Sequence, residues 1–105
     1  MKYTMKIYSQ EVEKLIITEP KNRLMENVLG LGEEAGEVLG KIKKLIRDKN
    51  FSKSDIIKEL GDCLFYITAI ANYLGDDLQA VADANMAKLK DRKKRDVIQG
   101  SGDNR

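Results

Sequence analysis

The chain has 105 residues, which is enough for one domain with a modest core. Its 19 basic and 17 acidic residues give a formal charge of +2, so its bulk charge excludes a strongly basic nucleic-acid binder. With one cysteine, Cys63, and no histidine, the chain can form neither an intrachain disulfide nor a Cys–His catalytic pair. It has no apolar run of membrane-spanning length and no signal-peptide pattern, so we expect a cytoplasmic protein.

Apolar residues at helical spacing, with a single proline, predict an all-α protein. The first helix is predicted over about residues 4–18 and is followed by a turn at residues 19–22, where Pro20 interrupts the helical pattern. A second, long helix is predicted over about residues 23–47. Gly32, Gly36 and Gly40 recur along it, and such a stripe would let another helix pack closely, either with no chemical consequence or to bring metal ligands of the third helix near.

The third helix is expected to begin after Ser54, a good N-cap residue, and to run to about residue 74, with Gly75 as its C-cap. Asp76 or Asp77 is expected to open a fourth helix that ends near residue 95. Four helices with short connections predict a four-helix bundle-like protomer.

We assign residues 1–95 to this single domain and residues 96–105 to a flexible tail. Because so short a chain has little core of its own, we also expect it to associate with further copies of itself.

Two acidic motifs lie inside apolar helical segments. Glu34 and Glu37 are three residues apart, as are Glu59 and Asp62, so each pair forms neighbours on a helix surface. If the second and third helices face each other, four carboxylates converge, and they repel one another unless protons or cations neutralise them. Without histidine, a metal ion there would have oxygen ligands, which predicts Mg²⁺, with Mn²⁺ as the alternative.

An oxygen-rich metal site of this kind suits the hydrolysis of phosphate esters or anhydrides, because Mg²⁺ bridges phosphate oxygens and lowers the pKa of a bound water. Glu33 or Glu37 is a candidate to orient or deprotonate that water. Lys41 lies on the same stripe of the helix as Glu34 and Glu37 and could neutralise phosphate charge. Two other classes remain open: a catalytically silent helical interaction module with a structural cation, and a nucleic-acid-associated protein that uses the basic run at residues 88–95.

Three motifs together resemble a known family. Glu33-Glu34-x-x-Glu37, then Glu59-x-x-Asp62, and finally Asn85-x-x-Lys88-Leu89 are similar to the motifs of MazG-like nucleoside triphosphate pyrophosphohydrolases, within the all-α NTP pyrophosphatase superfamily. The resemblance covers about residues 23–92. It implies that four carboxylates bind Mg²⁺ and that a fifth assists the site or positions water; the four are Glu34, Glu37, Glu59 and Asp62, and the fifth is Glu33.

The resemblance also implies the substrate contacts. Tyr66 matches a nucleotide-contacting position, Asn85 and Lys88 resemble substrate-binding positions, and Arg92 is a further candidate for phosphate. The implied reaction is cleavage of (d)NTPs between the α- and β-phosphates to a nucleoside monophosphate and pyrophosphate, for sanitation or control of nucleotide pools, by a homodimer or a dimer of dimers. The chain has no tryptophan, so another aromatic residue would stack on the base; the candidates are Tyr3, Tyr8, Phe51, Tyr66 and Tyr73.

Overall fold

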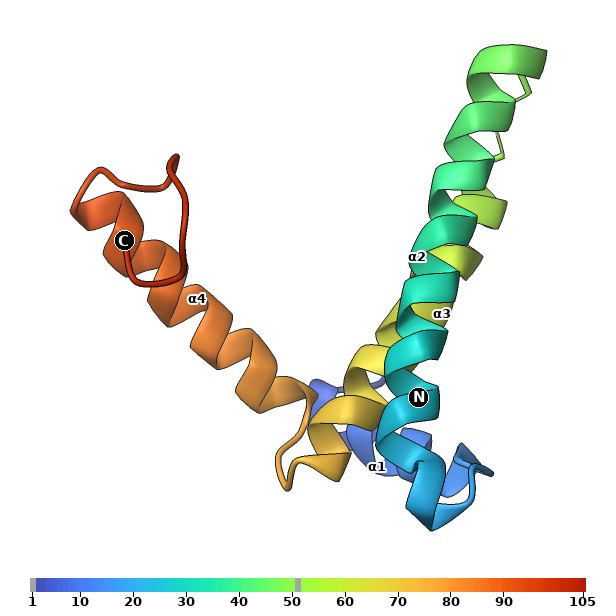
Figure 1. Ribbon diagram of the computed structural model, residues 1–105, viewed down its shortest axis with the longest axis horizontal. Coiled ribbons are helices and arrows are strands. Elements are labelled where there is room, and N and C mark those ends of the chain that lie inside the picture. Colours follow the sequence, from blue (N-terminus) through green and yellow to red (C-terminus); the bar gives the residue numbers. More distant parts are fainter. Residues whose placement is uncertain (1, 51) are drawn as a thin grey trace.

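The computed structural model describes residues 2–50 and 52–105, and in this part of the chain the regular structure is helical, without strands (Figure 1). Among these residues, no helix combines the length and apolar character needed to cross a membrane. The all-α prediction is thus confirmed. The elements in chain order are α1 (Met5–Leu15), a 3₁₀ turn η1 (Pro20–Asn22), α2 (Arg23–Asp48), α3 (Lys53–Tyr73) and α4 (Leu78–Lys94).

Side-chain caps set where three of the helices begin. The hydroxyl of Thr4 accepts a hydrogen bond from the N–H of Ile7, and the carboxylate of Asp77 accepts one from the N–H of Ala80. The cap of α3 is Ser52, whose hydroxyl accepts from the N–H of Asp55 at 3.3 Å. The prediction of Ser54 as this cap is wrong, because the extended backbone of Ser52 starts the helix two residues earlier and places Ser54 inside the first turn.

The helices α2 and α3 lie side by side, and α1 packs across one end of α3 (Figure 1). The small core lies where α1, α3 and the start of α4 meet. Ser9 holds this junction together, because its hydroxyl donates to the carbonyl of Met5 at 2.8 Å and accepts from the N–H of Leu78 at 3.0 Å. The buried apolar residues of this core are Val12, Ala69, Ala71 and Leu78.

Helix α4 does not lie along the other helices. It contacts α1 and α3 near its beginning, has no contact with α2, and projects away from the α2–α3 pair (Figure 1). The bundle-like protomer is therefore incorrect for the fourth helix, because only Leu78 of α4 enters the core while Val81 and Met86 further along remain exposed. The radius of gyration is 16.3 Å, against about 13 Å for a compact domain of this length.

Residues 96–105, which the sequence indicated as a flexible tail, curl back over the end of α4 (Figure 1). The guanidinium of Arg105 donates to the carbonyls of Val97, Ile98 and Gly102 at 2.6 to 2.9 Å. These bonds close the segment into a loop beside the last turns of α4.

Candidate functional site

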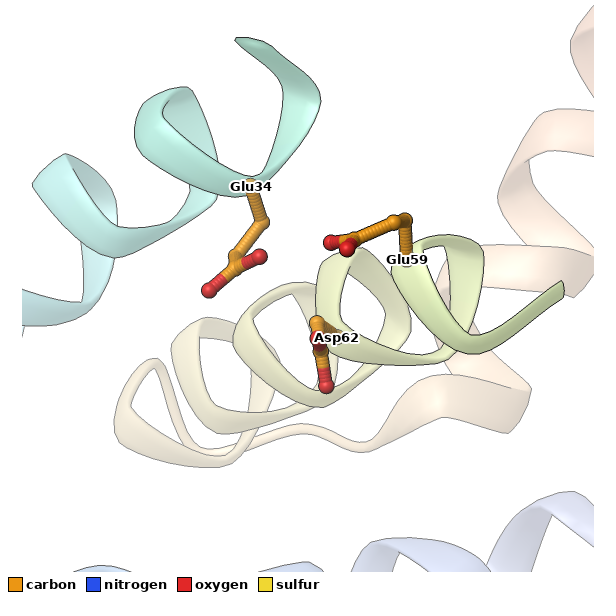
Figure 2. Close-up of side chains that lie close together, drawn as sticks. All are labelled: Glu34, Glu59 and Asp62. Atoms are coloured by element: carbon orange, nitrogen blue, oxygen red, sulfur yellow. The ribbon is translucent and has the colours of Figure 1, made fainter. Parts of the chain in front are cut away.

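Three carboxylates gather between α2 and α3. Glu34 extends from α2 toward Glu59 and Asp62, which lie one turn apart on α3 (Figure 2). One carboxylate oxygen from each residue lies within 4.8 Å of the others. Glu34 and Glu59 are half-buried and Asp62 is exposed. The two acidic motifs of the sequence thus meet across the helix pair.

The electrostatics of this cluster are those of crowded like charges. Partial burial, followed by the negative charges of Asp62, Glu59 and Glu33, raises the pKa of Glu34. Burial and then the charge of Asp62 raise the pKa of Tyr8, which comes from α1. A bound cation would neutralise the like charges that meet here. Three converging carboxylates and no softer donor fit a hard divalent cation such as Mg²⁺ or Mn²⁺.

The structure separates the other two acids of the first motif from this cluster. Glu37 is exposed one turn beyond Glu34 on α2 and is not among the three converging residues. Glu33 is also exposed and lines a shallow hollow together with Gly30 and Tyr66. Three of the four predicted ligands are therefore brought together in one chain.

Tyr66 lies one turn after Asp62 on α3 and rests directly against the backbone of α2. A methyl group added at Gly30 would lie 2.5 Å from Cζ and 2.8 Å from Cδ1 of the Tyr66 ring, well inside the ordinary carbon–carbon contact distance of about 3.5–4.0 Å. The ring of Phe65 meets that of Tyr66 edge-on, with centroids 5.4 Å apart. Because Gly30 has no side chain, it leaves room for the ring of Tyr66 beside the acids.

No signal in the sequence marked this role of Gly30, because the ring that it contacts belongs to Tyr66, far along the chain. A methyl group added at the stripe residues would meet no atom within 4 Å, and the same holds for Gly61 of α3. The expectation that the stripe provides close packing between helices is therefore wrong within one chain; the stripe residues are Gly32, Gly36 and Gly40.

A second hollow, of about 270 Å³, lies against the same aromatic pair. It is lined by the connection after α1, by Glu26 and Asn27 of α2, and by Phe65 and Tyr66. Asn27 is 3% exposed, and within the described part of the chain its amide nitrogen has no hydrogen-bond partner. No signal in the sequence marked this asparagine, because its burial depends on packing between three distant segments.

The remaining predicted substrate residues lie away from the acids. Asn85 and Lys88 are exposed on α4 and line an open hollow of about 510 Å³ there, while Arg92 is buried further along that helix. Lys41 lines a different hollow, at the beginning of α3. Because α4 does not contact α2 and projects away from it, a single chain does not bring the substrate residues predicted on the fourth helix to the acids.

Of the aromatic candidates for stacking on a base, Tyr66 lies beside the acids. The pKa of Tyr8 is raised by burial and then by the charge of Asp62. Tyr3 and Tyr73 are exposed, and Phe51 lies outside the described residues.

Comparison with known proteins shows the family of this chain. The family model of the MazG nucleotide pyrophosphohydrolase domain matches residues 22–97, which include all three clustered carboxylates. The gene 37 protein of Mycobacterium phage L5 is 46% identical over 82 residues, which cover 73% of this chain and 72% of the phage protein. No solved structure matches the chain. Because the family model covers most of the chain, including the two helices that carry the clustered acids, this chain belongs to the MazG nucleotide pyrophosphohydrolase domain family.

Proposed function

We propose that the protein is a Mg²⁺-dependent nucleoside triphosphate pyrophosphohydrolase. It cleaves (d)NTPs between the α- and β-phosphates, releases a nucleoside monophosphate and pyrophosphate, and so cleans or limits a nucleotide pool. The observation that carries the proposal is the convergence of Glu34, Glu59 and Asp62 from two helices in a chain of the MazG family.

These three carboxylates are the proposed cation ligands. Glu37 becomes a fourth ligand if its side chain turns toward the other three. A divalent cation held there neutralises phosphate charge and makes a bound water more acidic. Glu33 is the candidate to accept a proton from the attacking water, because it is exposed, lies next to Glu34 and faces the hollow beside Tyr66.

The hollow lined by Asn27, Phe65 and Tyr66 is the proposed place for the nucleobase. Its volume of about 270 Å³ is near the lower end of the usual range for ligand sites, so it suits a base rather than a whole nucleotide. Asn27 and Glu34 are seven residues apart on α2, a rise of about 10 Å. A nucleotide with its base in this hollow would extend along Tyr66 toward the acids.

A second copy of the chain is the proposed source of the substrate-binding side chains of α4 that one chain does not bring to its own acids. The chain exposes 8135 Å², against about 6,000 Å² for a folded monomer of its mass. The excess of about 2,000 Å² lies within the range of about 1,000–2,500 Å² that one subunit of an obligate homodimer buries. Such a partner would cover exposed apolar residues of α2 and α3 and would bring its own Asn85 and Lys88 to the acids; the apolar residues are Leu39, Ile42, Ile46, Ile57, Leu60 and Leu64.

The experiment that tests the function is a panel of canonical and modified (d)NTPs incubated with Mg²⁺, with products separated by chromatography. We expect monophosphate and pyrophosphate from the wild type and none in EDTA. Asp62→Ala and Glu37→Ala should each abolish turnover with circular dichroism unchanged, whereas Glu19→Gln, which changes an exposed acid in the connection before α2, should retain it.

Three results would contradict the proposal. Diphosphate and orthophosphate as products would keep a hydrolase but reject cleavage at the α–β bond. Stabilisation by Mg²⁺ without turnover of any nucleotide would favour a silent interaction module with a structural cation. Salt-sensitive binding of DNA or RNA by the basic end of α4, without turnover, would favour a nucleic-acid-associated protein.

A further inference from the structure

We propose that residues 96–105 form an internal brake, in which the carboxylate of Asp103 occupies the two cations of α4, Lys88 and Arg92, that would otherwise receive the phosphates of a nucleotide. This inference rests on the proposed function, in which Lys88 is brought to the acids, and it gives phosphate binding to Arg92 as well, one turn further along α4. The acidic residue of the loop acts as a substitute anion for the substrate.

The contacts at Arg92 show how closely the loop covers this position. Arg92 is 5% exposed, although arginine is rarely this buried without a partner. Its guanidinium donates to the main-chain carbonyl of Asp103 at 2.8 Å and lies 3.5 Å from an oxygen of the Asp103 carboxylate. The same carboxylate oxygen accepts from the Lys88 ammonium at 3.4 Å. One carboxylate therefore bridges two cations that lie one turn apart on α4.

The charges agree with this geometry. The hydrogen bond and the charge of Lys88, followed by those of Arg92, lower the pKa of Asp103. The carboxylate is thus held in its ionised form, as an anion competing for these cations must be. Lys88 also lines the open hollow on α4 with Asn85, so a polyphosphate that approaches this helix meets a site already occupied by Asp103.

The loop is shaped by its own hydrogen bonds, and among its contacts with α4 the ion pairs of the Asp103 carboxylate are the weak ones. Arg105 ties the loop to itself, and Gly102 adopts a φ of +83°, which lets the chain turn back at low cost. Arg95, which directly follows the last residue of α4, donates to the main-chain oxygen of Arg105. The Asp103 side chain, however, is 86% exposed, and ion pairs at such positions are weak and screened by salt. A multiply charged phosphate chain can therefore displace a single carboxylate.

The test measures binding of inorganic tripolyphosphate to the full chain by titration calorimetry in EDTA, where the acidic cluster holds no cation. Asp103→Asn removes the competing charge and should tighten binding about threefold or more. The matched control is Asp96→Asn, which removes an exposed acid of the same segment outside the Lys88 and Arg92 contacts. Its backbone φ of +60° suits asparagine, so its affinity should equal that of the wild type.

A second comparison locates the effect on α4. In a Lys88→Met background, Asp103→Asn should tighten tripolyphosphate binding less than it does in the wild type, because one of the two competed cations is gone. Equal affinity of wild type and Asp103→Asn, or no detectable binding by either, overturns the brake.

Turnover separates this inference from the proposed function. If the wild type hydrolyses NTPs, Asp103→Asn should lower KM and leave kcat unchanged, since the brake acts on binding and not on the reacting atoms. A wild type that releases no monophosphate refutes the proposed function, and calorimetry still decides the brake. Normal turnover with unchanged KM in Asp103→Asn refutes the brake alone.

Discussion

Replacement of Gly30 by alanine probes the contact that places an aromatic ring beside the acidic cluster. The added methyl group would lie 2.5 Å from Cζ of Tyr66, about 1 Å inside normal contact, so the ring has to move away from α2. Overpacking of this size costs about 1–3 kcal/mol, while replacing a helical glycine by alanine returns about 0.5–1 kcal/mol. We expect Gly30→Ala to lower the free energy of unfolding by about 1 kcal/mol, and by no more than about 2.5 kcal/mol.

The assay is urea unfolding followed by circular dichroism at fixed protein concentration, with Gly32→Ala as the control. An added methyl group at Gly32 meets no atom within 4 Å, so this variant should gain about 0.5–1 kcal/mol. The displaced ring should also raise KM for NTPs in Gly30→Ala. A Gly30→Ala protein at least as stable as the wild type would refute the reasoning, because it would mean that the Tyr66 ring does not rest on α2.

Two further predictions concern the acids and the cap of α3. The pKa of Glu34 is raised above its ordinary 4.5, so ionised Glu34 destabilises the cation-free fold, and thermal stability in EDTA should rise as the pH falls from neutral through the raised pKa toward 4.5. Glu34→Gln should melt higher than the wild type in EDTA at pH 7, lose this pH dependence and gain less from Mg²⁺; an unchanged pH profile would contradict the crowding of charges. Ser52→Ala should cost about 1 kcal/mol in urea unfolding through loss of the cap, and Ser54→Ala less than about 0.5 kcal/mol. Equal losses in the two serine variants would show that Ser52 is not the cap.

Features that depend on neighbours along the chain were readable from the sequence. Helical spacing of apolar residues predicted the first three helices, Asp76 or Asp77 indicated the start of the fourth, and Pro20 marked the break before α2. The sequence also indicated that a serine caps α3. It pointed to Ser54, and the extended backbone at Ser52 makes Ser52 the cap. The spacing of three within each acidic motif predicted that both motifs would present carboxylates on one helix surface. The MazG family followed from the same residues.

Features that depend on how the helices meet were decided only by the tertiary structure. Periodicity alone could not choose between Glu34 and Glu37, and the rotation of α2 against α3 brought Glu34 to Glu59 and Asp62. The start of α4 is held against α1 by a buried hydrogen bond from the N–H of Leu78 to the Ser9 hydroxyl, between residues 69 positions apart.

The contacts of Gly30 and Asp103 likewise join positions distant in sequence. The glycine stripe and the polar tail gave no local sign of them, because a glycine or an aspartate has the same local pattern whether a ring or a cation lies against it. Local spacing therefore determined the helices and the family, and packing between distant residues decided which side chains meet.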